Sequence, residues 1–151
     1  MQTLNQVYAT FGFMLLPAEI ESKTLIPALR AILAKKLADD HNIREEEISK
    51  MLGVTQAAVS NYIRGTRGDP ALITKLLSEP EVSNLINELT DNLSSDMAYT
   101  PSSLSKFIGL CNYIKSSLLI CEIHHNLESN IDEKVCKECE NMLLKGPGSV
   151  Y

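Results

Sequence analysis

The stretch EEEISKMLGVTQAAVSNYIRG, residues 45–65, contains two short helical patterns separated by one glycine. The first pattern runs from Arg44 to Leu52, and Gly53 accepts the left-handed backbone that a tight exit from a helix needs. The second begins after Thr55, which can cap its N-terminus, and closes at Gly65. The apolar seam between them comprises Ile48, Leu52, Val54, Val59 and Tyr62 or Ile63, with the small Ser49 at the crossing. This spacing predicts a helix-turn-helix (HTH).

The second helix of an HTH enters the major groove of DNA, with the outward side chains near its N-terminus toward the bases. We expect Gln56 and Asn61 to pair with adenine through their amides, and Ala57 to touch a thymine methyl group. Phosphate contacts are expected from hydroxyl groups and from the cations of the loop RGTRG. The predicted DNA-binding residues are Thr55, Gln56, Ala57, Ser60, Asn61, Arg64 and Arg67.

The segment GVTQAAVSNYIRGTRG, residues 53–68, resembles the lambda-repressor-like (Xre-type) HTH family. Over a wider span, Leu15–Cys139, the chain is similar to a group of predicted archaeal transcriptional regulators with late cysteines. The resemblance implies DNA binding and transcription regulation. One position departs from the family, which usually has Gln at the start of the first HTH helix to buttress a phosphate contact. This chain has Glu45, Glu46 and Glu47 there, where they complement the helix dipole.

The flanking sequence predicts an all-α fold with an HTH domain at residues 14–93 and a helical, cysteine-rich region at 102–145. Apolar residues recur at helical spacing from Thr24 to Asp40, and shorter helices are expected at Pro70–Leu77 and Glu81–Leu93. The polar stretch Ser94–Pro101 is the predicted domain boundary. A long helix is expected from Ser102 to Leu119. Its predicted apolar face consists of Leu104, Phe107, Ile108, Cys111, Ile114 and Leu118, and a last short helix surrounds Cys139–Leu143. Residues 1–13 are interpreted as an N-terminal arm, either flexible or used in pairing.

Composition agrees with a small helical protein. The 151 residues are 44% hydrophobic with no Trp, so the core rests on aliphatic side chains. The net charge is −5, yet residues 30–67 hold seven basic and five acidic side chains, which makes the HTH region positive. Because the chain lacks both a membrane-length apolar run and the charged start of a secretory signal, we expect a cytoplasmic protein with no membrane partner.

The four cysteines all fall in the last 41 residues and suggest one site. Cys136 and Cys139 form C-x2-C, and Cys121 with His124 forms C-x2-H at the same spacing. Two ligand sets fit. Cys111, Cys121, Cys136 and Cys139 predict an iron–sulfur cluster, here expected to be [4Fe-4S]; replacing Cys111 by His124 predicts Zn²⁺. A redox-sensing disulfide between Cys136 and Cys139 is the third possibility. Cys111 lies at an apolar position of a predicted helix and can also be interpreted as an ordinary core residue. His125 has no obvious partner and is expected to be exposed.

These patterns favour a transcriptional regulator over an enzyme, because the chain has no phosphate-binding glycine loop, nucleophile elbow or HExxH motif. We expect it to bind double-stranded operator DNA as a homodimer, on a palindromic site, and to sense redox state, oxygen or iron through the cluster. The alternatives are a zinc-stabilised regulator without redox sensing and an HTH-based protein-interaction adaptor.

Overall fold

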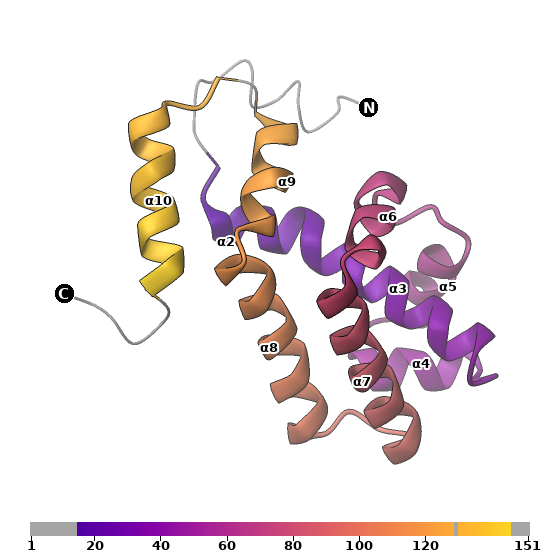
Figure 1. The fold of residues 1–151 in the computed structure, drawn as a ribbon. Coiled ribbons are helices and arrows are strands. Elements are labelled where there is room, and N and C mark those ends of the chain that lie inside the picture. The colour runs from indigo at the N-terminus through magenta and orange to yellow at the C-terminus, as the bar shows by residue number, and fades with distance from the viewer. Residues whose placement is uncertain (1–14, 129, 146–151) are drawn as a thin grey trace. The chain divides into compact units, whose positions relative to one another are not determined.

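The computed structural model describes residues 15–128 and 130–145, and these residues form helices and no strand (Figure 1). The predicted all-α class is confirmed. The helices are α2 (Pro17–Ile20), a π-helical turn (Glu21–Leu25), α3 (Ile26–Asp39), α4 (Glu45–Leu52), α5 (Gln56–Ile63), α6 (Pro70–Ser78), α7 (Pro80–Asp96), α8 (Pro101–Ser116), α9 (Leu119–Leu127) and α10 (Glu133–Lys145). The predicted N-terminal arm, residues 1–13, lies outside the described residues.

Contacts between Cα atoms divide the chain into two compact units, which differ from the division expected at Ser94–Pro101. One unit is Ser22–Cys111, called the HTH unit below after the predicted motif that it contains. The other joins residues 15–21 to the described residues from Asn112 to Lys145, and we call it the C-terminal unit. The first eleven residues of α8 therefore belong with the HTH helices, because they pack against α7 side chains rather than only following them in sequence.

The core of the HTH unit surrounds α3. Its inward side chains are Ala28, Leu29, Ala31, Ile32, Leu33, Ala34 and Leu37, all buried. The small alanines allow α4, α5, α6 and α7 to approach α3 closely, and each of these four helices contacts it. The helix starts two residues later than Thr24, because the backbone first makes the π-helical turn, and Pro27 then occupies its first turn, where no amide hydrogen is needed.

Two helices complete this unit. Asp69 caps α6 by accepting a hydrogen bond from the Ala71 backbone N–H at 2.9 Å, and Pro70 begins the helix. α7 continues three residues beyond the predicted end, to Asp96, and stops where Met97 adopts a left-handed conformation with φ of 49°.

The expected long helix Ser102–Leu119 is two helices in the structure. α8 ends at Ser116, and Leu118 has φ of 64° before α9 begins. The predicted apolar face is also corrected in part: Leu110, Cys111 and Ile114 are buried, whereas Leu104 and Ile108 remain 40% and 50% exposed. The turn rotates the helix that follows, so the periodicity of the first helix does not continue into the second.

In the C-terminal unit, α9 supplies most of the buried surface, through Leu119, Ile120, Ile123 and His124. α2 contacts α9, and Glu128 accepts a hydrogen bond from the Leu15 backbone N–H at 3.0 Å. Lys115 and Glu21 form an ion pair at 3.0 Å. α10 differs from the other long helices, because none of its residues is buried.

Candidate nucleic-acid interface and cysteine cluster

The turn between α4 and α5 has the geometry that its sequence predicts. Gly53 adopts φ of 65°, and the Val54 backbone N–H donates to the Ser49 carbonyl at 3.1 Å. Thr55 then caps α5, because its Oγ1 accepts a hydrogen bond from the Ala58 backbone N–H at 3.1 Å. The short turn fixes the direction of α5 relative to α4.

Packing holds this pair of helices rigidly. Ile48 and Val59 are fully buried, Leu52 and Tyr62 are nearly so, and both helices contact α3 as well as each other. Val54 and Ile63 are half-buried at the edge of the seam. A core of this kind presents the outer face of α5 as a fixed surface rather than as a mobile segment.

The residues that the sequence predicts for DNA contact lie on α5, at its N-cap and in the loop that follows it. Thr55, Gln56 and Ala57 are exposed at its N-terminal end, Ser60 and Asn61 are half-buried, and Arg64 and Arg67 are exposed beyond its C-terminal end. All seven residues are thus at least partly exposed along α5 and at its two ends.

Asn61 has a local role that the sequence did not reveal. Its side-chain Oδ1 accepts hydrogen bonds from Arg64 Nη2 and from Thr66 Oγ1, both at 3.3 Å. Its backbone carbonyl accepts from the backbone N–H groups of Thr66 and Arg67 at 3.0 and 3.3 Å. A pairing of Asn61 with adenine would thus require its amide oxygen to leave Arg64 and Thr66.

The loop after α5 is held close to the helix. The guanidinium carbon of Arg67 lies 5.6 Å from the centre of the Tyr62 ring, within the range of a cation–π contact. At Gly68, φ is 88° and an added Cβ would meet the Ala31 Cβ at 3.0 Å, so only glycine fits where the loop passes α3. Arg64 and Arg67 therefore sit on a defined loop at the end of α5.

The first turn of α4 carries acidic rather than amide side chains. Glu46 pairs with Lys50 and Glu47 pairs with Arg44, each at 3.6 Å, on the exposed surface. Exposed ion pairs contribute little to stability, but these two neutralise the positive charge of Arg44 and Lys50 at α4. Any phosphate contact must then come mainly from α5 and the loop after it.

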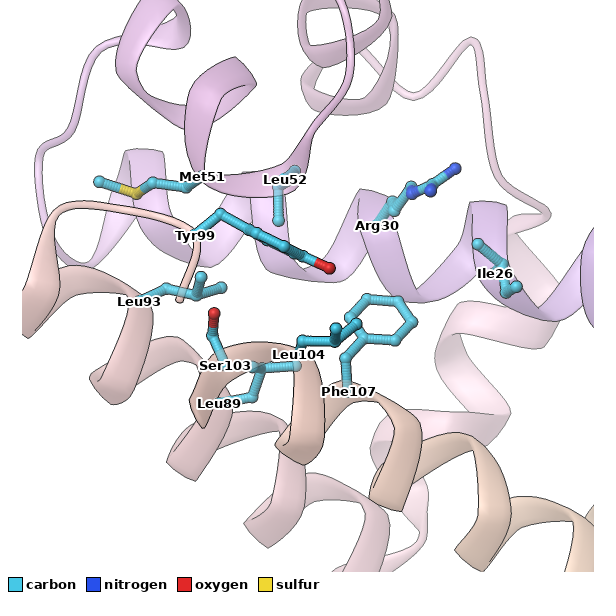
Figure 2. A pocket seen from close by; sticks show the side chains of 10 residues that line it. All are labelled: Ile26, Arg30, Met51, Leu52, Leu89, Leu93, Tyr99, Ser103, Leu104 and Phe107. Carbon is cyan, nitrogen blue, oxygen red and sulfur yellow. The ribbon is translucent and has the colours of Figure 1, made fainter. Parts of the chain in front are cut away.

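A cavity of about 220 Å³ lies inside the HTH unit, between α4 and the helices α7 and α8 (Figure 2). Figure 2 shows Met51 and Leu52 of α4 on one side, Leu89 and Leu93 of α7 on the other, and the Tyr99 ring between them. Its lining is mainly apolar. This cavity lies against the inner side of α4, so the packing around it supports the HTH.

Three of the four cysteines gather in the C-terminal unit. Burial, the nearby thiol of Cys139, the carboxylate of Glu140 and the thiol of Cys136 together raise the pKa of Cys121 to about 11. Burial, Cys136 and Glu140 also raise the pKa of Cys139. The Cys121 thiol of α9 therefore lies within electrostatic range of Cys136, Cys139 and Glu140 of α10.

The two adjacent histidines have different surroundings from those expected. His124, the predicted zinc ligand, is buried, and its Nε2 lies 2.6 Å from Glu128 Oε2. His125, interpreted as a residue without a partner, is exposed as expected, but its Nε2 lies 3.5 Å from Cys136 Sγ. The difference arises because α9 turns by about 100° per residue, so only one of two adjacent side chains can face α10.

Cys111 has surroundings of a different kind from those of the other three cysteines. Its side chain is only 3% exposed, on the buried face of α8 with Leu110 and Ile114, and contacts assign it to the HTH unit. The electrostatic neighbours that raise the pKa of Cys121 are the other two cysteines and Glu140.

The donors around α9 and α10 fit a metal in chemical type, since thiolate and imidazole are the preferred ligands of Zn²⁺ and thiolates hold iron–sulfur clusters. Within residues 15–128 and 130–145, however, no three His, Cys, Asp or Glu side chains are arranged closely enough to hold a metal ion. Any such site would need these side chains to rearrange.

Comparisons with family models, with curated proteins and with solved structures find no match for this chain. Among the described residues, none of the helices has both the length and the apolar character needed to cross a bilayer.

Proposed function

We propose that this protein is a sequence-specific DNA-binding transcriptional regulator that reads double-stranded DNA through α5. The observation that carries the proposal is the exposed polar face of α5, held against a buried seam by the Gly53 turn and the Thr55 cap. A simple pair of packed helices needs the seam but not an outer row of amide, hydroxyl and guanidinium groups.

Each part of this face matches one component of DNA recognition. Gln56 and Ala57 lie at the N-terminal end, where base edges are reached, and Gln56 offers a donor and an acceptor to adenine. Arg64 and Arg67 lie beyond the other end, where they suit the phosphate backbone. The acidic first turn of α4 favours a docking in which these arginines supply most of the phosphate contacts.

We propose that the protein acts as a homodimer on a palindromic operator. One recognition helix reads only a few base pairs, so two copies related by a two-fold axis are needed for specificity, with half-sites about one helical turn, roughly 34 Å, or a multiple of it apart. Light scattering of the full chain, free and with operator, tests this part of the proposal, and a monomer in both states would contradict it.

The C-terminal unit supplies the regulatory part of the proposal. We propose that it binds a metal through cysteine thiolates, as an iron–sulfur cluster that senses redox state, oxygen or iron, or as Zn²⁺. The grouping of Cys121, Cys136 and Cys139 supports a shared site, and Cys111 is the residue on which the choice between the two metals depends.

Selection of bound fragments from the source genome by the full chain tests DNA recognition and needs no assumption about the operator sequence. The expected result is enrichment of one palindromic sequence, protected in the major groove. Enrichment of no sequence, together with equal weak binding to every duplex, would instead favour the protein-interaction adaptor.

A further inference from the structure

α10 is held in place by few apolar contacts. The helix has thirteen residues, none of them buried, and an isolated helix of this length is only marginally stable in water. Three of its apolar side chains, Val135, Met142 and Leu144, are 46–60% exposed. Apolar burial therefore does little to fix α10, and another interaction must do so.

The side of α10 that is partly covered carries metal-binding chemistry. Cys136, Cys139 and Glu140 are half-buried there, at spacings of three and four residues that share one helix face. Cys121 and His125, four residues apart on α9, line one cleft together with Glu140. Glu140 is the α10 side chain that lines this cleft, and Cys136 reaches its edge through a contact with His125.

The distance between the two nearest donors agrees with a tetrahedral zinc centre. Zn–S and Zn–N bonds of about 2.3 and 2.0 Å at the tetrahedral angle put sulfur and nitrogen about 3.5 Å apart. Cys136 Sγ and His125 Nε2 are separated by 3.5 Å in this structure. This separation suits a thiol–imidazole hydrogen bond and equally one edge of a coordination tetrahedron, while the other donors of the described residues are not within reach.

We propose that the cleft between α9 and α10 is a zinc site with Cys121, His125, Cys136 and Cys139 as its four ligands. Binding of Zn²⁺ draws α10 toward α9, and the three thiols release their protons to solvent as they become thiolate ligands. His124 is not a ligand because it is buried against Glu128, and Cys111 is not required. The inference rests on the proposed metal-binding role of the C-terminal unit and is independent of DNA binding.

The test uses the full chain, made metal-free under reducing conditions and titrated with Zn²⁺ in competition with a chromogenic chelator. We expect one zinc per chain. His125→Ala should weaken zinc binding by more than about tenfold, the smallest loss that even an indirect partner of a ligand causes. His124→Ala is the matched control, with affinity close to that of the wild type, and Cys111→Ser should also retain zinc. His125 is exposed, so His125→Ala should leave the fold intact. His124 and Cys111 are buried, so circular dichroism must first show that His124→Ala and Cys111→Ser are folded before their zinc affinities are compared.

Three results would overturn this assignment, and they differ in what else they contradict. Loss of zinc in His124→Ala but not in His125→Ala would show that His124, and not His125, is the fourth ligand. A brown, oxygen-sensitive protein that needs Cys111 would exclude the zinc site but keep the proposed metal-binding role. Failure to bind either metal would contradict both, while DNA binding, measured separately, would still stand.

Discussion

Arg64 Nη2 donates a hydrogen bond to Asn61 Oδ1 at 3.3 Å. Asn61, the proposed contact to adenine, therefore positions Arg64, the proposed contact to phosphate. Thr66 Oγ1 contacts the same oxygen. Asn61 therefore organises the end of α5 in addition to its proposed contact with DNA. This coupling changes what a substitution at Asn61 is expected to do.

Asn61→Ala should weaken binding to the operator by about 1–3 kcal/mol and should also weaken binding to random DNA, because Arg64 loses its support. The salt dependence of binding should become shallower. Fluorescence anisotropy at several salt concentrations measures both effects. A loss confined to the operator, with an unchanged salt slope, would show that Asn61 acts only on a base.

Gly53→Ala should destabilise the HTH unit by about 1–2 kcal/mol, since φ of 65° is strained for a residue with a Cβ. The added methyl meets no atom within 4 Å, so the cost comes from the backbone alone. Gly109→Ala is the matched control, because Gly109 lies inside α8, also has free space, and should stabilise by about 0.5–1 kcal/mol. Urea unfolding of both variants measures these changes, and equal effects would refute this account of the turn.

Met51→Ala should lower the free energy of unfolding by about 2–5 kcal/mol, because Met51 is fully buried and borders the existing cavity beneath α4. Met142→Ala, at a site 55% exposed on α10, should change stability little. Thermal unfolding compares the two. A small effect of Met51→Ala would mean that the cavity collapses and that α4 is not supported rigidly.

The helices α4 and α5 and the turn between them could be predicted from the sequence because their signals are local: a glycine, a capping threonine and a seam at helical spacing. The break between α8 and α9 could not be predicted from the sequence, because Leu118 has a positive φ that leucine rarely adopts. The contact of His125 with Cys136 was also missed, because which of two adjacent histidines faces α10 depends on the rotation of α9. Long-range helix packing sets that rotation.

The Cys121 thiol of the metal-free protein should be slow to alkylate. Its pKa of about 11, against an ordinary 9.0, leaves about 100-fold less thiolate at pH 8 than in the unfolded chain. The rate should therefore keep rising with pH well above 9. Mass spectrometry of the Cys121 peptide after timed alkylation, with the same chain in urea as control, measures it. Equal rates in the folded and unfolded chains would contradict the burial of Cys121 and the neighbouring thiols and carboxylate that together raise its pKa.

The central claim is that α5 reads base sequence, and the ratio of affinities for the selected palindrome and a random duplex tests it most directly. Gln56 is exposed at the N-terminal end of α5, so Gln56→Ala should lose about 1–3 kcal/mol on the palindrome and little on random DNA. Asn84→Ala, an exposed amide on α7, should leave the ratio at its wild-type value. An unchanged ratio in Gln56→Ala, or equal losses on both duplexes, would contradict the account.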